Sequence, residues 1–184
     1  FNTYFKNNKY ISIATARAGN VIGGGDFSQD RIIPDVIRSI TSNSTLKIRS
    51  PKSTRPWQHV LEPLRGYIDL SINLHQNFKN SGVNFNFGPR IRENFTVIEI
   101  IKMIKFRIPN LKVKIDKSFK IKESGLLRLN CKKANQILNW KPYLNTKQSI
   151  NLTIDWYLDY INKKNIEELT LNQINNYFEK NNFK

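Results

Sequence analysis

The sequence is poor in cysteine and histidine, and it has no long apolar run. One cysteine, Cys131, permits no internal disulfide, which is typical of proteins from a reducing compartment. Two histidines and one cysteine cannot supply four ligands to a zinc ion unless carboxylates take part. No apolar run approaches the ~20 residues of a membrane span, and the first ten residues have no signal-peptide pattern. We therefore expect a cytoplasmic protein with no metal and no membrane partner.

The length and composition predict a folded chain. With roughly 150 residues to a domain, 184 residues correspond to one domain or slightly more. Apolar residues make up 39% and aromatic residues 11%, which is enough for a core and argues against disorder. The chain opens on FNTYFKNNKY without a methionine, so we expect it to begin inside a longer protein.

The charge is strongly one-sided. Thirty Lys and Arg against fourteen Asp and Glu give a net charge of +16. One interpretation is a polyanionic partner such as nucleic acid, and the other is lysine dispersed over a solvated surface. The densest basic run, residues 112–122, holds five lysines but has no helical spacing that would suit a recognition helix. Dispersed lysine is therefore the favoured interpretation, and no nucleic-acid partner is predicted.

Short apolar runs alternate with amphipathic stretches, which indicates an α/β or α+β fold. We expect strands over Tyr10–Thr15, Leu46–Arg49 and Val83–Phe87, the first of them buried on both faces. Capping-box patterns predict helix starts at Thr96–Glu99 and at Thr170–Gln173. Apolar residues at helical spacing predict buried stripes in five helices: Ile33, Val36, Ile37 and Ile40; Leu64, Ile68 and Ile72; Val97, Ile100, Ile101 and Ile104; Ala134, Ile137 and Leu138; Ile150, Ile154, Leu158 and Ile161.

Three segments need more than packing to explain them. Arg17–Asp26 contains three consecutive glycines directly after the first strand, where ligands bind in open α/β sheets; a plain turn is an equally good reading. Thr54–Val60 holds Arg55, a rigid fork of donors suited to a diphosphate, beside Trp57; taken alone, a surface arginine beside a core tryptophan fits better. Asp30–Pro34 is a charged pair that would cap a helix, and a plain helix start is the stronger reading.

His59 and Glu62 could suggest a metal pair. Two ligands are too few to hold an ion, and structural roles are the better expectation for both side chains.

Taken together and in order, these segments are specific. The strings ARAGNVIGGGD, RIIPDVIR, STRPWQHVLEPLRGY, FNFGP, LRLNCKKA and LNWKP span nearly the whole chain. The chain resembles the C-terminal part of the CDP-glucose 4,6-dehydratases, within the extended short-chain dehydrogenase/reductase superfamily. The resemblance implies an α/β fold: the C-terminal portion of a Rossmann-like NAD(P)-binding fold plus a smaller α/β sugar-nucleotide-binding domain. Residues 1–30 and 62–90 would belong to the Rossmann domain, and residues 31–61 and 91–184 to the substrate-binding portion.

The resemblance also implies a reaction and its participants. Such enzymes oxidise C4 of a nucleotide-diphosphate sugar with NAD, eliminate water across C5–C6 and return the hydride to C6. They work in the cytoplasm in pathways such as lipopolysaccharide O-antigen biosynthesis, and they commonly form homodimers. The expected substrate contacts are Asn20, Arg31, Ile32 and Arg55, with Arg49 and Trp57 lining the same cleft; the expected cofactor contacts near the nicotinamide are Ala18, Gly19 and Val21.

Parts of the family pattern fall outside this chain. The resemblance places the NAD fingerprint and the catalytic Tyr-x-x-x-Lys pair before Phe1. Residues 1–9 would be the end of the helix that carries the Tyr and the Lys. The chain alone is therefore expected to be inactive. Lys122-Glu123-Ser124 and Asn130 depart from the family's His-Glu-Ala and Asp, so a uridine or guanosine specificity stays open. A basic nucleic-acid-binding module and an inactive gene remnant are the remaining alternatives.

Overall fold

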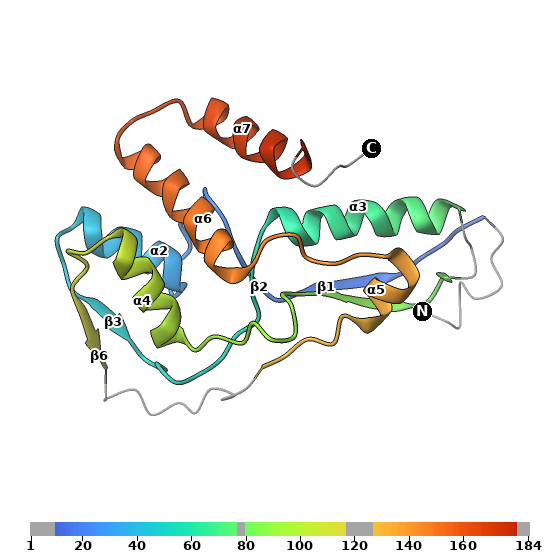
Figure 1. Cartoon of the computed structure of the whole chain (residues 1–184), viewed down its shortest axis with the longest axis horizontal. Helices are drawn as coiled ribbons and strands as arrows, with labels where there is room; N and C mark the ends of the chain where they lie inside the picture. Colours follow the sequence, from blue (N-terminus) through green and yellow to red (C-terminus); the bar gives the residue numbers. More distant parts are fainter. Residues whose placement is uncertain (1–9, 77–79, 117–126, 180–184) are drawn as a thin grey trace.

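Parallel strand pairs form the centre of the molecule, and helices cover them (Figure 1). The computed structural model describes residues 10–76, 80–116 and 127–179. The strands, each joined to its parallel partner, are β1 (Thr15–Ala18) with β5 (Asn84–Phe87), β2 (Asn20–Ile22) with β4 (Trp57–His59), and β3 (Leu46–Ile48) with β6 (Val113–Ile115). The helices are α2 (Ile32–Thr41), α3 (Leu61–Gln76), α4 (Val97–Arg107), α5 (Lys132–Leu138), α6 (Thr146–Ile161) and α7 (Ile166–Glu179).

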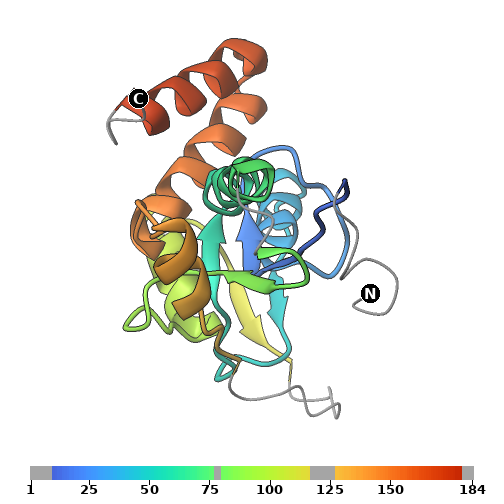
Figure 2. The same cartoon turned by 90° about the vertical axis from the view of Figure 1, so that its right-hand side faces the viewer.

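Two apolar clusters hold these elements together. The larger joins β2, β3 and β4 to α2, α4 and α6. The smaller packs Phe85 and Phe87 of β5 against Leu70 of α3 and against Ala134 and Trp140 at α5. Figure 2 shows α3 end-on above the strands, while α7 projects away from them. In the described part of the chain, none of the helices has both the length and the apolar character needed to cross a membrane.

Local sequence explains several helix starts. Thr96 accepts a hydrogen bond from the Glu99 backbone N–H at 3.4 Å, and the Glu99 carboxylate accepts from the Thr96 N–H at 2.8 Å. This capping box confirms the predicted start of α4. A second box starts α6, where Asn145 and Gln148 satisfy each other's backbone N–H groups.

The other predicted capping box is wrong. Thr170 lies inside α7, where its hydroxyl donates to the Ile166 carbonyl oxygen at 2.7 Å. The helix begins four residues earlier because the Asn165 side chain accepts from the Glu168 backbone N–H at 3.2 Å, as an N-cap residue does.

The first predicted strand is also wrong in its bounds and burial. Residues 10–14 are not in a strand, and Tyr10 is 93% exposed. The strand that forms is β1, whose Thr15, Ala16 and Arg17 are exposed. Burial of a strand on both faces requires elements packed against those faces, and among the described elements β1 packs mainly against its neighbour β5.

The helix α3 forms as predicted but buries the opposite side. Its predicted stripe of Leu64, Ile68 and Ile72 is about half exposed, at 47%, 50% and 49%. The buried face instead carries Leu61, Glu62, Pro63, Arg65, Gly66 and Leu70. The remaining predicted strands agree with the structure to within one residue at their ends, and the remaining helix stripes face the core except in α5, where Ile137 is 37% exposed. Residues 1–9 and 122–124 lie outside the described residues.

Candidate functional site

A cavity of about 620 Å³ lies between β2, the start of α2, the end of β3 and the segment before β4. Its size suits a small-molecule ligand. The cavity brings together all six predicted substrate contacts: Asn20, Arg31, Ile32, Arg49, Arg55 and Trp57. Gly19 and Val21 also line it, whereas Ala18 is not among its lining residues. Whether these side chains bind a ligand stays a prediction.

Charged residues of both signs line this cavity. The basic side chains are Arg31, Lys47, Arg49 and Arg55, and the acidic ones are Asp26, Asp30 and Asp35. The sequence analysis included these acidic residues in its motifs but did not predict them as contacts of the site. It missed Lys47, since alternation of buried Leu46 and Ile48 about an exposed Lys47 marks a strand and carries no sign of a cavity.

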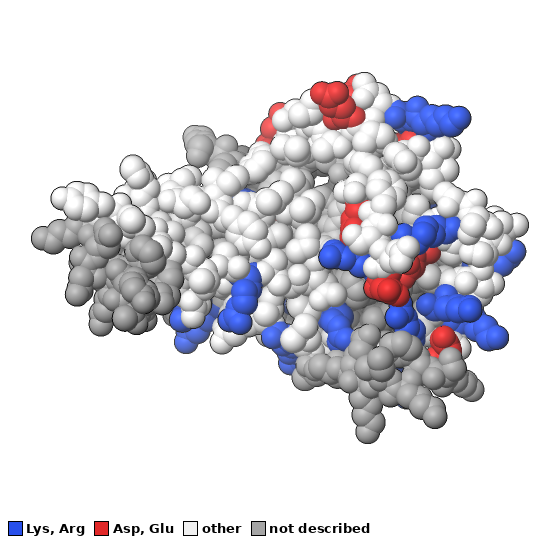
Figure 3. All heavy atoms as spheres, turned by 180° about the vertical axis from the view of Figure 1, so that it is seen from behind, with Lys and Arg blue, Asp and Glu red and all other residues white. Residues whose placement is uncertain are grey.

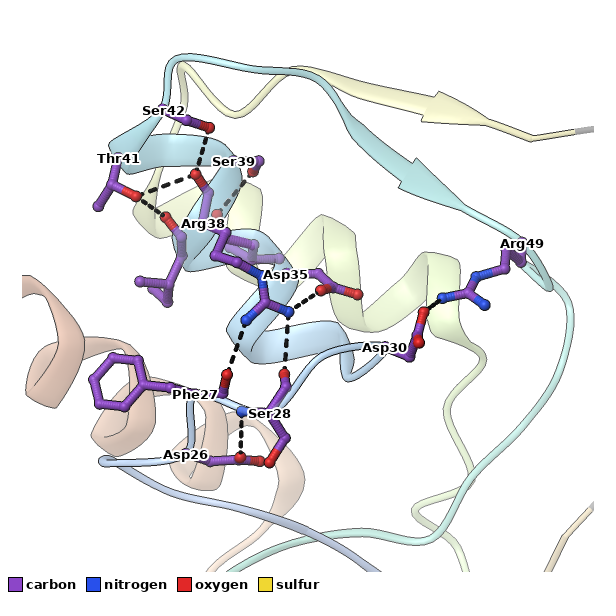
Figure 4. A network of polar contacts seen from close by, with 12 residues as sticks. Asp26, Phe27, Ser28, Asp30, Asp35, Arg38, Ser39, Thr41, Ser42 and Arg49 are labelled. Atoms are coloured by element: carbon purple, nitrogen blue, oxygen red, sulfur yellow. Dashed lines mark hydrogen bonds and ion pairs between the residues drawn. The ribbon is translucent and has the colours of Figure 1, made fainter.

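Ion pairs tie two of the arginines to two of the carboxylates. Arg31 lies 3.3 Å from an Asp26 oxygen, and Arg49 pairs with Asp30 (Figure 4). The plain helix start favoured for Asp30–Pro34 is confirmed, because α2 begins at Ile32, whereas the alternative of a capping charged pair is not. Arg31 is the N-cap residue of α2, and its side chain makes no capping hydrogen bond.

The loop between β2 and α2 is held from the helix side by Arg38. Its guanidinium donates to the carbonyl oxygens of Phe27 and Ser28, both at 3.0 Å, and pairs with Asp35 (Figure 4).

Partial burial acts to raise the pKa of Asp26, but hydrogen bonds from Ser28 and the charge of Arg31 outweigh it and lower that pKa. Asp26 is therefore a fixed carboxylate at the cavity wall.

Arg55 and Trp57 enter the cavity from the segment before β4. The Arg55 guanidinium donates to the Thr54 carbonyl oxygen at 2.8 Å, and its side chain is half-buried. Trp57 is 5% exposed, and its indole N–H has no hydrogen-bond acceptor among the described residues. A rigid fork of donors beside a flat apolar ring is the combination that the sequence suggested.

The glycine run packs against the C-terminal helices. A Cβ at Gly24 would lie 2.0 Å from Trp156 Cδ2 in α6, and one at Gly23 would lie 2.8 Å from Val60 Cγ1. Gly25 has a φ of +80°, a conformation that side chains disfavour. Close packing at Gly24 and a turn at Gly25 thus explain two of these glycines, whereas Gly23 also lines the cavity.

Helix α6 therefore positions the cavity's loop. The Tyr157 hydroxyl donates to the Asp26 carbonyl oxygen, and its ring lies edge-on to Phe27 with centroids 5.8 Å apart. Burial, with the Asp26 charge, raises the pKa of Tyr157 to about 12. Trp156 in turn donates to the Thr170 hydroxyl of α7 at 2.9 Å.

The segment predicted to contact the cofactor, Ala18 to Val21, would form only one wall of a dinucleotide site. A Cβ at Gly19 would lie 2.4 Å from the Pro56 carbonyl oxygen, and that oxygen accepts from the Asn20 N–H at 2.9 Å. The space beside Gly19 is therefore filled by the protein itself. Within the described residues, this segment offers no cradle for the cofactor's phosphates.

His59 and Glu62 are structural, as the sequence favoured. Burial lowers the pKa of His59 to about 4, and its Nδ1 accepts from the Leu61 N–H at 3.4 Å. Glu62 is fully buried and accepts from the backbone N–H groups of Tyr143 and Leu144 at 2.9 and 2.7 Å. The described residues contain no cluster of three or more potential metal ligands.

Glu62 also belongs to a buried network that fastens α7 to α3. The Tyr177 hydroxyl donates to Glu62 at 3.0 Å and accepts from Arg65 at 3.1 Å. The Arg65 guanidinium lies over the rings of Tyr143 and Trp140, 4.1 and 5.4 Å from their centroids. Burial raises the pKa of Glu62 against these favourable contacts.

The spacing Tyr-x-x-x-Lys does occur, at Tyr143–Lys147 and Tyr160–Lys164, although the family's catalytic pair was expected only before Phe1. Neither pair lines the cavity. Tyr143 lies on Arg65 and precedes the N-cap Asn145, so it does not share a helix face with Lys147. Tyr160 stacks on Trp156 with an interplanar angle of 8°, and Lys164 pairs with Asp159 at 2.8 Å.

Comparison with known proteins gives one relative by sequence and many by fold. No family model matches the chain. The CDP-glucose 4,6-dehydratase of Salmonella typhimurium is 36% identical over 181 residues, which are 96% of this chain and 50% of that protein. The match falls in that protein's C-terminal half. The chain thus spans half the length of the curated relative it matches.

Solved structures share the fold at lower identity. The UDP-glucose 4-epimerase of Stenotrophomonas maltophila, with bound NAD, has a TM-score of 0.71 at 14% identity, over 83% of this chain and 49% of that one. The dTDP-glucose 4,6-dehydratase of Bacillus anthracis, in complex with NAD, has a TM-score of 0.65 at 17% identity, over 85% and 47%. The UDP-glucuronic acid 4-epimerase of Bacillus cereus has a TM-score of 0.68 at 20% identity, over 83% of this chain and 47% of that one.

The parallel strands and the similarity to these solved structures show a Rossmann-type fold, which this chain shares with the NAD-dependent epimerases and dehydratases named above. By sequence, the chain is similar to the C-terminal half of a CDP-glucose 4,6-dehydratase, which confirms the predicted resemblance.

Proposed function

We propose that this chain forms the nucleotide-sugar-binding half of a sugar-nucleotide 4,6-dehydratase that converts CDP-glucose to CDP-4-keto-6-deoxyglucose. The observation that carries the proposal is the convergence of three arginines, Asn20 and Trp57 on one cavity. The 36% identity to a CDP-glucose enzyme supports the choice of substrate.

In this proposal the cavity holds the diphosphate. Arg55 forks onto its oxygens, because guanidinium geometry suits two parallel hydrogen bonds, and Arg31 and Asn20 contact the same group. The N-terminus of α2 opens beside them without a side-chain cap, and a helix N-terminus favours an anion. Trp57 and Ile32 supply apolar walls, and Arg49 lies at the rim.

NAD is the proposed cofactor, and it would supply reversible hydride transfer. Gly19 and Val21 would form one wall beside its nicotinamide, with Ala18 next to them in sequence; the rest of its site is assigned to the half of the relative that this chain does not match. The proposed division keeps residues 1–30 and 62–90 in the Rossmann domain. Residues 31–61 and 91–184 form the substrate-binding portion.

The proposal extends to the protein's setting. Cytoplasmic location, a role in lipopolysaccharide O-antigen biosynthesis and a homodimer in the complete enzyme rest on the resemblance alone. The 184-residue chain by itself is proposed to be inactive, since the segment predicted to contact the cofactor, residues 18–21, offers no cradle for the phosphates of NAD.

Calorimetric titration of the chain with CDP-glucose, CDP, UDP and GDP tests this proposal. We expect CDP and CDP-glucose to bind more tightly than UDP and GDP, and incubation with NAD and CDP-glucose to give no 4-keto product. A folded chain that binds none of these nucleotides would overturn the proposal, and tighter binding of UDP or GDP would change the substrate.

The net charge of +16 supports one rival, a nucleic-acid-binding module. On the face in Figure 3, Lys and Arg side chains form separate groups, with acidic side chains among those at one end. Titration with duplex DNA at several salt concentrations separates the two readings. A nucleic-acid module loses affinity steeply, with a slope of about −0.9 per phosphate contacted, whereas a nucleotide sugar meets only a few cationic groups.

A further inference from the structure

The two carboxylates paired with arginines at the cavity are held very differently. The Asp26 side chain is 30% exposed, accepts from the Ser28 backbone N–H at 3.0 Å, and sits in a loop fastened by Tyr157. The Asp30 side chain is 71% exposed. Asp26 is thus fixed by its surroundings, whereas Asp30 has open space into which its side chain can move.

Backbone geometry brings Asp30 to Arg49. Asp30 has a φ of 60°, in the left-handed region. Figure 4 shows its carboxylate directed at the Arg49 guanidinium, so the pair joins the segment before α2 to the end of β3. Both residues line the cavity, and this link therefore crosses its rim.

We propose that Asp30 is a placeholder for the ligand's phosphate. It holds Arg49 while the cavity is empty, and it releases Arg49 to a phosphate oxygen when a nucleoside diphosphate binds. The inference rests on the proposed function and gives Asp30 a role in setting the affinity of the same site for phosphate groups.

The exchange is favourable for a diphosphate and unfavourable for an uncharged ligand. An exposed ion pair contributes little to stability, whereas a charge-assisted contact between arginine and phosphate is strong and often bidentate. A nucleoside without phosphates has no group that can take the place of the Asp30 carboxylate on Arg49. Asp30 therefore competes with ligands that carry the anion, and it leaves the binding of uncharged ligands unaffected.

Calorimetric titration of the 184-residue chain and its Asp30→Asn variant with CDP, inorganic pyrophosphate and cytidine tests this. Asparagine tolerates the left-handed backbone, so the substitution removes the charge and leaves the turn. We expect Asp30→Asn to bind CDP and pyrophosphate about two- to fivefold more tightly, the size of an exposed ion pair, with no gain for cytidine. Asp159→Asn makes the same charge change at a distant pair with Lys164 and should have no effect.

An Arg49→Gln background separates exchange from general electrostatics. If Asp30 competes for Arg49, the gain from Asp30→Asn disappears once Arg49 is replaced. A parent chain that binds CDP, with no gain in Asp30→Asn or with the same gain in the Arg49→Gln background, would overturn the placeholder role alone. A folded parent and variant that both fail to bind CDP would overturn the proposed function and this inference with it.

Discussion

The indole of Trp156 occupies the space that a side chain at Gly24 would need. A Cβ built on Gly24 lies 2.0 Å from Cδ2 of this ring, which is closer than any real contact. The second glycine of the GGG run is therefore a requirement of helix α6, which is more than 120 residues away in sequence.

Gly24→Ala should destabilise the fold by about 1–3 kcal/mol or more, because the large ring must shift to make room. Urea unfolding followed by circular dichroism measures the change. Gly88→Ala is the matched control, since a Cβ there meets its nearest atoms at an ordinary 3.4 Å. Equal stability of the two variants would contradict the packing argument.

Arg55→Lys should weaken binding of CDP about 10- to 100-fold. A lysine cannot replace two parallel hydrogen bonds, and a contact to a charged group contributes about 1.5–3 kcal/mol. Calorimetry gives the two dissociation constants. Arg107→Lys, whose guanidinium pairs with Asp155 outside the cavity, serves as the control. An Arg55→Lys chain that binds CDP like the parent would move the diphosphate elsewhere.

His59 should make the fold sensitive to mild acid. Its pKa is about 4 when folded and about 6.5 when unfolded. The unfolded state therefore binds the proton more readily, and stability falls as the pH drops from about 6.5 towards 4. The loss amounts to about 3 kcal/mol when complete.

Unfolding free energies at several pH values test this against His59→Asn, which keeps an acceptor for the Leu61 N–H but does not titrate. The parent should lose more stability than His59→Asn over that range. His75→Asn, at an exposed position of α3, should retain the parent's profile. Parallel profiles for parent and His59→Asn would show that the imidazole is not buried as described.

Tyr177→Phe should cost about 1–3 kcal/mol of folding stability. The variant removes the hydroxyl that lies between Glu62 and Arg65, so two buried charged groups each lose a hydrogen bond. Tyr160→Phe, at a 46% exposed ring, should change stability by less than about 0.5 kcal/mol. Thermal melts of the two variants provide the comparison, and a neutral Tyr177→Phe would remove the network's role in holding α7.

The exposed stripe on α3 should make the chain self-associate. Leu64, Ile68 and Ile72 lie on one face of the helix, and an apolar face of this kind promotes association. Sedimentation velocity should show a smaller average mass for the Leu64→Gln, Ile68→Gln, Ile72→Gln variant. The control replaces Ile91 and Phe106, which are 85% and 83% exposed elsewhere on the surface. Similar behaviour of the two variants would mean that general surface hydrophobicity drives association.

Local patterns predicted what local contacts decide. The capping box at Thr96 starts α4 because both of its hydrogen bonds lie within four residues. The same pattern at Thr170 failed, since Asn165 offers an earlier cap and the Thr170 hydroxyl bonds within the helix. A capping pattern marks a helix start only where no better cap precedes it.

Long-range contacts decided the rest. The buried face of α3 holds Glu62 and Arg65 because Tyr143 and Tyr177 reach them from distant segments, which no helical period indicates. The six substrate contacts were predicted from the family resemblance, whereas the ion pairs of Asp26 and Asp30 with arginines became visible only in the folded structure. Sequence alone predicted where most helices lie, but it predicted neither β2 and β4 nor the side of α3 that meets the core.

The Glu62 network also dictates an order of events during synthesis. Glu62 emerges from the ribosome well before its partners, of which Tyr177 follows 115 residues later. At roughly 5–20 residues per second, that interval is about 6–23 s. Throughout it Glu62 and Arg65 lack the hydroxyl that lies between them, so this buried network is complete only after α7 has been made.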